Sequence, residues 1–199
     1  MHPEHEQPPS TPEHGALEEL EPRPQPRIYV ASLSDYNAGR LHGTWLDATG
    51  DSTELAAAIN DMLARSPEPH AEEWAIHDYE GFGPLRLSEY ESIDTIARIA
   101  DGITTHGSAF AHWAAIVGTA TEDLDSFEDG YLGHADSIEA YAEELVDDLG
   151  YTDLIDREIP EHLQPYVKFD VESFAHDLEL SGDVTTSEGD GGVHLFTHT

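Results

Sequence analysis

The thirteen histidines are the first residues to examine for chemistry, because a neutral imidazole is a common metal ligand. A zinc pair on a helix needs two histidines four residues apart, whereas His106 and His112 are six apart. His194 and His198 are four apart, but they fall in a predicted strand and in the chain end after it. The spacings therefore predict solvent-exposed histidines and no metal site.

One acidic segment has part of the pattern of a calcium-binding loop. Counted from Asp125, acids occupy loop positions 1 and 5, and Gly130 occupies position 6. Phe127 stands at position 3 and Asp136 at position 12, where the loop needs an oxygen ligand and a bidentate glutamate. The sequence also lacks a cysteine nucleophile, a GxxxxGKS/T phosphate loop and a GxSxG elbow. The residues therefore nominate no nucleophile, and no motif predicts a cofactor.

The total charge excludes several classes of partner. The 199 residues include 42 acidic and 8 basic residues, which gives a formal net charge of −34. Nucleic-acid and anionic-membrane binding both depend on lysine and arginine, so neither partner is expected. The 38% hydrophobic content is enough to form folded cores. Because the sequence has no membrane-length apolar run, no signal-peptide pattern and no cysteine, we expect a cytoplasmic protein.

The distribution of the charge is more informative than its total. Between Arg98 and Arg157 there is no basic residue, and the 58 intervening residues contain 14 acids. A solvated helix face normally alternates lysine with glutamate, because opposite charges at i and i+4 stabilise it and like charges repel. Eleven of these acids are the candidate target-binding residues: Glu122, Asp123, Asp125, Glu128, Asp129, Asp136, Glu139, Glu143, Glu144, Asp147 and Asp148.

Three explanations fit such uncompensated charge: solubility in high salt, a binding surface for a basic partner, or compositional drift. Duplex DNA carries about one negative charge per 1.7 Å of axis, so −34 corresponds to roughly 60 Å, or about 17 base pairs. Surface carboxylates can then stand where phosphates stand and bind the arginines of a DNA-binding cleft. The sequence thus predicts a protein that imitates DNA, with an acidic halophilic domain as the alternative.

The elements that would carry these acids follow a proline-rich beginning. Residues 1–26 hold seven of the twelve prolines and six glutamates, so we expect a disordered tail. Residues 27–90 combine strand and helix patterns, which predicts an N-terminal α+β domain. Its expected elements are strands near 28–33, 44–48 and 73–79 and a helix from Asp51 to about Arg65.

The rest of the chain predicts two further small domains, which makes the fold class α+β. Residues 91–133 form a helical middle domain, in which Gly102 ends a first helix and residues 110–117 form a second. Residues 134–199 form a C-terminal α+β domain. Its expected elements are a helix from Ser137 to a C-cap at Gly150, a helix from Asp170 to Gly182, and a hairpin of 183–186 with 193–196.

Three segments resemble the ArdA antirestriction family. They are YVASLSDYNAGRLHGTWLDA at residues 29–48, EDGYLG at 128–133 and FDVESFAHDLELSGD at 169–183. The resemblance extends over residues 27–199 and leaves the proline-rich tail outside the family pattern. It implies an elongated α+β protein of three domains that is a homodimer through its C-terminal domain and has no catalytic activity.

The resemblance also implies a target. Members of the family imitate bent B-form DNA and occupy the DNA groove of type I restriction-modification enzymes, in the methyltransferase and specificity core, which protects incoming mobile DNA. A DNA mimic directed at another DNA-binding protein stays open as an alternative. The segment LIDREIPEHL at 154–163 resembles the antirestriction motif, which implies a role in the motif or in the dimer interface for Leu154, Ile155, Asp156, Ile159, Pro160, Glu161 and Leu163.

Overall fold

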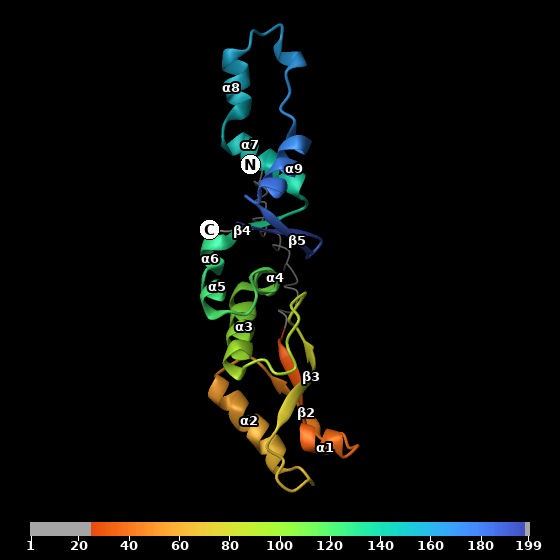
Figure 1. Cartoon of the computed structure of the whole chain (residues 1–199). Helices are drawn as coiled ribbons and strands as arrows, with labels where there is room; N and C mark the ends of the chain where they lie inside the picture. Colours follow the sequence, from red (N-terminus) through yellow and green to blue (C-terminus); the bar gives the residue numbers. More distant parts are fainter. Residues whose placement is uncertain (1–24, 198–199) are drawn as a thin grey trace, which may run out of the picture.

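The computed structural model describes residues 25–197, which form nine helices, a short 3₁₀ helix and six strands. In chain order they are β1 (Arg27–Ser32), α1 (Leu33–Asn37), β2 (Gly43–Asp47), α2 (Ser52–Ala64), β3 (Trp74–Glu80), α3 (Ile93–His106), α4 (Ser108–Val117), α5 (Thr121–Asp125), α6 (Phe127–Gly130), β4 (Tyr131–Ala135), α7 (Ile138–Asp148), α8 (Tyr151–Glu158), η1 (Gln164–Tyr166), α9 (Val171–Ser181), β5 (Thr185–Gly189) and β6 (Gly192–Phe196). Figure 1 shows an elongated body with the β1–β3 sheet at one end and α8 at the other. The predicted α+β class is confirmed.

The predicted disordered tail lies outside the described residues, except for Gln25 and Pro26. Pro26 is buried, and its carbonyl oxygen accepts a hydrogen bond from the Ala48 backbone N–H at 2.9 Å. The folded structure therefore includes at least one residue that the composition assigned to the tail. No helix in the described part of the chain is long and apolar enough to cross a bilayer.

The first sheet is antiparallel, in the order β2-β1-β3, and the three strands were expected from the sequence. Ile28, Val30 and Ile76 alternate along β1 and β3, so they bury one face of the sheet beneath α2. Helix α2 begins where predicted, because the Asp51 carboxylate accepts a hydrogen bond from the Thr53 backbone N–H at 2.7 Å.

The middle of the chain is helical, but the predicted break at Gly102 is wrong. Gly102 lies inside α3 and is buried against the Phe110 ring of α4, where a Cβ would overlap the ring. The chain turns instead at Gly107, whose φ of 73° is the left-handed conformation that glycine adopts readily. Gly102 therefore allows α3 and α4 to pack closely, and Gly107 ends α3.

The second sheet is also antiparallel, in the order β4-β6-β5. The predicted hairpin is confirmed, with β5 and β6 joined at Asp190 and Gly191, which both have positive φ, as a tight hairpin turn requires. Strand β4 was not predicted, and it crosses the expected domain boundary between residues 133 and 134. It is only five residues long, with glycine at its centre, so its sequence carries little strand propensity, and its pairing with β6 contains a register shift.

The helices beyond the second sheet form a thin arm, which we define as residues 138–181. Helices α7 and α9 pack side by side and bury Ala142, Val146 and Ala175. Gly150 has left-handed φ, as a C-cap glycine does, but it also precedes α8, a helix that the sequence did not predict. Helix α8 has no buried residue. The remaining chain, residues 25–137 and 182–197, holds one continuous core that runs from Ile28 to Phe196.

Candidate functional site

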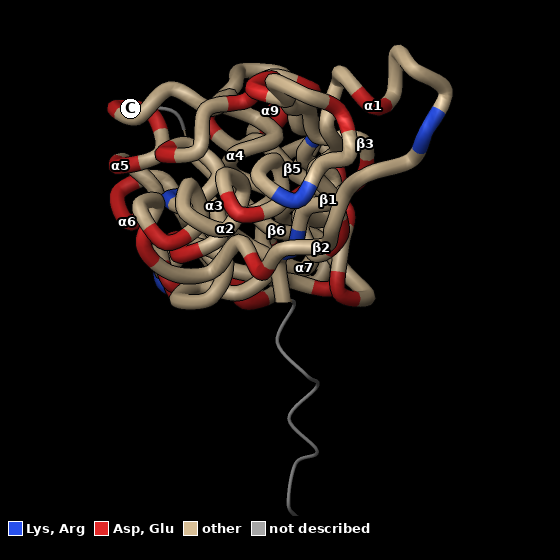
Figure 2. Tube along the Cα trace, turned by 90° about the horizontal axis from the view of Figure 1, so that it is seen from below, with Lys and Arg blue, Asp and Glu red and all other residues tan. Residues whose placement is uncertain are grey.

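All eleven candidate acids are exposed, and they lie on α5, α6 and α7 or in the short segments between these elements. Helices α5 and α6 precede β4 of the second sheet, and α7 follows β4 as the first helix of the arm. Figure 2 shows acidic residues around much of the outline of the molecule and few basic positions. The predicted acidic surface is therefore accessible to a large partner.

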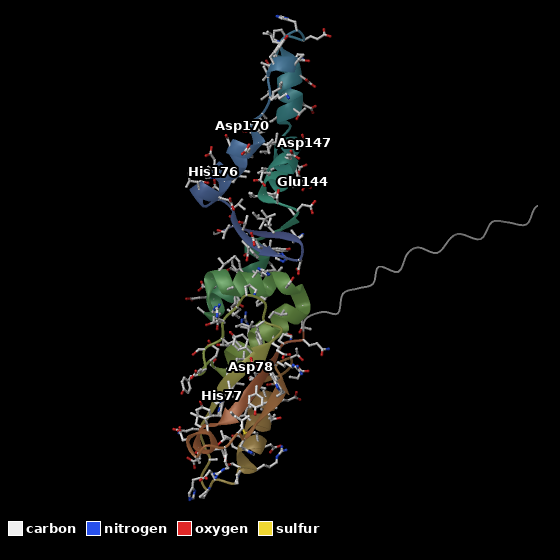
Figure 3. The ribbon with its side chains drawn as sticks, turned by 90° about the vertical axis from the view of Figure 1, so that its right-hand side faces the viewer. His77, Asp78, Glu144, Asp147, Asp170 and His176 are labelled. Atoms are coloured by element: carbon white, nitrogen blue, oxygen red, sulfur yellow. The ribbon has the colours of Figure 1, made fainter. Side chains whose placement is uncertain are left out.

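Helix α7 carries the densest group of these acids, and its local sequence explains why they point outward. The Ser137 hydroxyl accepts the Ala140 backbone N–H at 3.2 Å and begins the helix, while Ala142 and Val146 take the inner face. A hydrogen bond with the Ser137 side chain also lowers the pKa of Glu139, which favours its charged form. Figure 3 shows Glu144 and Asp147 on α7, next to α9.

The acids of α7 repel one another along the helix. Glu139 with Glu143, Glu143 with Asp147, and Glu144 with Asp148 are like-charge pairs at i and i+4. Each such pair destabilises a helix by about 0.2–0.5 kcal/mol. Among the described residues, Asp125 is the one member of the eleven that forms a salt bridge, and its partner is Arg98. The fold thus retains an electrostatic penalty that a few lysines would remove.

The acids of α5 and α6 are fixed to a rigid support. Leu124 and Phe127 are buried between these acids, and the Trp113 indole N–H donates a hydrogen bond to the Asp123 carbonyl oxygen at 3.0 Å. The Arg98 salt bridge to Asp125 ties α5 to α3. The carboxylates on these two short helices therefore keep a defined spacing relative to the main core.

Helix α9 adds acids that the sequence-based site did not include. Glu172, Asp177 and Glu179 are exposed on α9, which packs against α7. A signal was present in the sequence, because residues 158–199 contain nine acids and a single lysine, Lys168. The acids of α9 lie after Arg157, outside the stretch without any basic residue. The packing of α9 against α7 places them beside the acids of α7.

The first sheet and its helices treat charge differently. Arg27 forms a salt bridge with Glu80 at 2.6 Å, and Arg40 forms one with Asp35 at 3.4 Å and another with Glu68. Asp35 is fully buried at the start of α1. Burial raises the pKa of Asp35, but hydrogen bonds from Ser66, Ser32 and Arg40 outweigh it and hold the pKa below its ordinary value. Three acids at this end, Glu80, Asp35 and Glu68, are therefore partnered by arginines or hydroxyl groups.

The segment that resembles the antirestriction motif lies at the far end of the arm, on α8 and the turn after it. Leu154, Asp156, Pro160, Glu161 and Leu163 are exposed, and Ile155 and Ile159 are half-buried. Neighbouring apolar side chains are exposed as well, with Tyr166 84% and Leu149 60% accessible. The structure thus separates this apolar end from the first sheet by the length of the molecule (Figure 1).

The expectation that the histidines are solvent-exposed is wrong for two of them. His112 on α4 is 6% exposed and His194 on β6 is 3% exposed, and their ring centroids lie 4.7 Å apart. Long-range packing brings them together, so no spacing in the sequence could have indicated the pair. Within residues 25–197, no group of three or more histidine, aspartate or glutamate side chains has the arrangement of a metal site. His198 lies outside the described residues.

Comparison with known proteins gives one result that bears on this surface. The family model described as "Antirestriction protein (ArdA)" matches residues 28–191 of the 199-residue chain. The match includes every one of the eleven candidate acids and the apolar end of the arm. No curated protein sequence matches the chain.

Proposed function

Because this chain belongs to the ArdA family of antirestriction proteins, we propose that it inhibits type I restriction-modification enzymes by occupying their DNA-binding site. The observation that carries the proposal is the run of exposed, uncompensated carboxylates on α5, α6 and α7. A carboxylate offers two oxygen acceptors to an arginine fork, much as a phosphate does. The acids would therefore replace DNA phosphates in the cleft of the methyltransferase and specificity core.

The elongated shape supports this proposal, because a DNA groove is long and lined by basic side chains along its length. The charge of −34 equals that of roughly 60 Å of duplex, at about one charge per 1.7 Å. A field of one sign also steers association with a basic cleft and makes the rate fall as salt is added. Binding should therefore be fast at low ionic strength and should weaken with salt, as DNA binding does.

In this proposal the protein acts as an inhibitor and carries out no catalysis. Restriction and modification by a type I enzyme use the same DNA groove, so occupation of that groove blocks both reactions. The place of action is the cytoplasm, where incoming mobile DNA meets the enzyme.

The apolar end of the arm supports a second part of the proposal, a homodimer. Leu154 of α8, Leu163 in the turn after it and Tyr166 of η1 expose apolar surface, and neither α8 nor η1 has a buried residue. A second copy would cover this surface through a two-fold interface, in which the same patch contributes from both chains. Such a dimer would join two acidic bodies end to end and lengthen the surface that imitates DNA.

The test is an assay in which cleavage and methylation of one DNA substrate by a purified type I enzyme are measured while the protein is titrated. We expect both activities to fall together and to be restored by added duplex DNA. A control with a magnesium-dependent endonuclease that is not a type I enzyme checks that the protein does not simply sequester magnesium.

Four results would contradict the proposal. Loss of cleavage without loss of methylation would place binding outside the shared groove. Inhibition that added DNA does not relieve would exclude competition for the DNA site. A folded protein with no effect on the enzyme would favour another DNA-binding target, and a protein that unfolds at low salt would favour the halophilic alternative.

A further inference from the structure

A row of polar side chains crosses the second sheet on the face that contacts α4. In the strand register His194 of β6 lies between Ser187 of β5 and His134 of β4, so these side chains share one face. From α4, the Nδ1 atom of His112 lies 2.7 Å from the Ser187 hydroxyl, and the His112 ring packs against His194. The contact between α4 and this sheet is therefore partly made of histidine.

Asp190, in the β5–β6 turn, provides the carboxylate of this cluster. It accepts a hydrogen bond from the Ser108 hydroxyl at the start of α4, and one of its oxygens lies 3.1 Å from His194 Nε2. The Tyr131 hydroxyl lies 3.3 Å from His194 Nδ1. Ser108 and His112 thus hold α4 to the hairpin through Asp190 and Ser187, which are more than seventy residues away in the chain.

The charge balance of the cluster depends on protonation. The titratable groups that face the histidine pair are Asp190 from the turn and Tyr131 and His134 from β4. The negative charge of the Asp190 carboxylate can balance the positive charge of one protonated histidine ring. A second proton would place two positive rings next to each other in a contact that excludes water, which is strongly unfavourable.

Burial lowers the pKa of His112, with repulsion from His194 in the same direction and Asp190 opposing both. Burial also lowers the pKa of His194 against the raising effect of Asp190. Because the packed rings bind protons less readily than free rings, protonation favours their separation. The contact between α4 and the second sheet has its full stability at pH values above the ordinary histidine pKa of about 6.5. It loses stability as the pH falls below that value.

The neighbouring row of the same interface is apolar and does not titrate in this range. Trp113 of α4 packs against Phe196 of β6 with ring centroids 5.5 Å apart. The Thr197 backbone N–H donates to the Gly130 carbonyl oxygen at 2.8 Å, where α6 runs directly into β4. If the polar row opened, this side would stay attached and act as a hinge.

We propose that the His112–His194 pair is a pH-sensitive latch. On protonation it separates Ser108 and His112 of α4 from the β5–β6 hairpin, while Trp113 stays packed on Phe196. The second sheet and the arm then rotate about this attached side and the α6–β4 connection. The latch sits between the acids of α5 and α6 on one side and those of α7 and α9 on the other, so its opening changes the spacing of the two groups. This inference rests on the interface alone and is independent of the proposed target.

The test measures distance across the latch in the full chain. The sequence has no cysteine, so a dye pair can be placed by two substitutions, at the exposed residues Asn60 on α2 and Leu180 on α9. A second pair, Asn60 with Ala115 on α4, stays on one side of the latch. Energy transfer is followed from about pH 7.5 to about pH 5, the range in which histidine titrates, with excess unlabelled chain to exclude transfer between copies.

We expect transfer across the latch to change in a transition with its midpoint below the ordinary histidine pKa, while transfer within the first side and the helical circular dichroism stay constant. The variant His112→Asn with His194→Gln keeps hydrogen-bonding atoms near Nδ1 and Nε2 but cannot titrate, and it should abolish the transition. The exposed His176 on α9 provides the control His176→Asn, which should leave the transition unchanged.

Several outcomes would overturn the latch. A constant transfer efficiency in the unsubstituted chain would show that the interface does not open, whatever the variants do. The same transition in the double variant would assign it to other groups. Equal changes in both dye pairs, with loss of circular dichroism, would indicate global unfolding. If the double variant does not fold, His112→Asn alone should still shift the midpoint.

Discussion

The two ends of the molecule differ in how their acidic and large apolar side chains are placed. Around the first sheet, arginines pair with acids, and apolar residues such as Ile28 and Ile96 join one continuous core. In the arm, acids stand in like-charged rows along α7, and large apolar side chains such as Tyr166 point to solvent. The first end therefore has paired charges and a buried core, whereas the arm has unpaired like charges and exposed apolar side chains.

The largest effect should come from removal of charge in the acidic stretch. Changing five of its acids to their amides should weaken binding to a type I enzyme by about 2–3 kcal/mol, or roughly thirty- to a hundred-and-fifty-fold in Kd, at about 0.5 kcal/mol for each exposed ion pair. The five are Glu128, Asp136, Glu143, Glu144 and Asp148. Binding is measured by competition with labelled duplex DNA at fixed salt.

The matched control neutralises five exposed acids near the arginine-bearing end: Glu54, Asp61, Glu72, Glu73 and Glu89. We expect a loss of affinity several times smaller, because nearby arginines already reduce the negative potential there. Equal losses for the two sets would mean that net charge alone decides binding and that the comparison between the two ends has no functional meaning.

The apolar end of the arm should decide the oligomeric state. Tyr166→Ser with Leu154→Ser should weaken the proposed dimer by about 1–3 kcal/mol, or roughly five- to a hundred-and-fifty-fold in the dissociation constant, because buried aromatic anchors dominate interfaces. Sedimentation velocity over a concentration series measures the change. Leu180→Ser, on α9 near the second sheet, removes a leucine that is even more exposed than Leu154 (75% against 43%) and should leave the dimer intact. An unsubstituted chain that sediments as a monomer would refute the dimer.

The stability of the continuous core should be more sensitive to an added methyl group than that of an exposed helix face. Gly102→Ala should lower the free energy of unfolding by about 1–3 kcal/mol, because the new Cβ overlaps the Phe110 ring more than the gain in helix propensity repays. Urea unfolding followed by circular dichroism measures it. Ala57→Ser, on the exposed face of α2, should stay within about 0.5 kcal/mol. A stabilised Gly102→Ala variant would show that α3 and α4 pack less tightly than described.

The smallest effects should come from single acids in the acidic stretch. Glu143→Gln should change affinity for the enzyme by about twofold or less, because one exposed ion pair contributes little. It should also slightly stabilise α7, since two like-charge contacts disappear. A loss of affinity of more than tenfold from this one substitution would indicate that Glu143 makes a specific contact with the enzyme, and would contradict binding through many equivalent acids.

Several features of the fold could be predicted because their signals are local in sequence. Asp51 and Ser137 cap α2 and α7 at the predicted positions, and Gly182 ends α9 in the left-handed conformation. The hairpin of β5 and β6 was also expected, from the glycines of its turn. Each of these signals acts over a few residues, through a side chain and the backbone next to it, so a linear pattern can reveal it.

The elements that the sequence did not reveal depend on partners far along the chain. Strand β4 is a strand because it pairs with β6, about sixty residues later, and α8 is a helix with no buried face to produce a clear apolar pattern. Gly102 continues a helix because Phe110 packs against it. Local propensity gave no sign of these outcomes, since tertiary contacts outweigh differences of about 1 kcal/mol per residue.

The acidic surface could be predicted from the sequence, because charge is a sum over residues and most acids stay exposed wherever they fall. Only the tertiary structure decided that acids of α9 join those of α7, that apolar residues of the arm face solvent, and that two histidines become the buried pair at the interface of α4 with the second sheet. Burial is a property of which elements fold against each other, and for His112 and His194 that contact joins residues far apart in the chain.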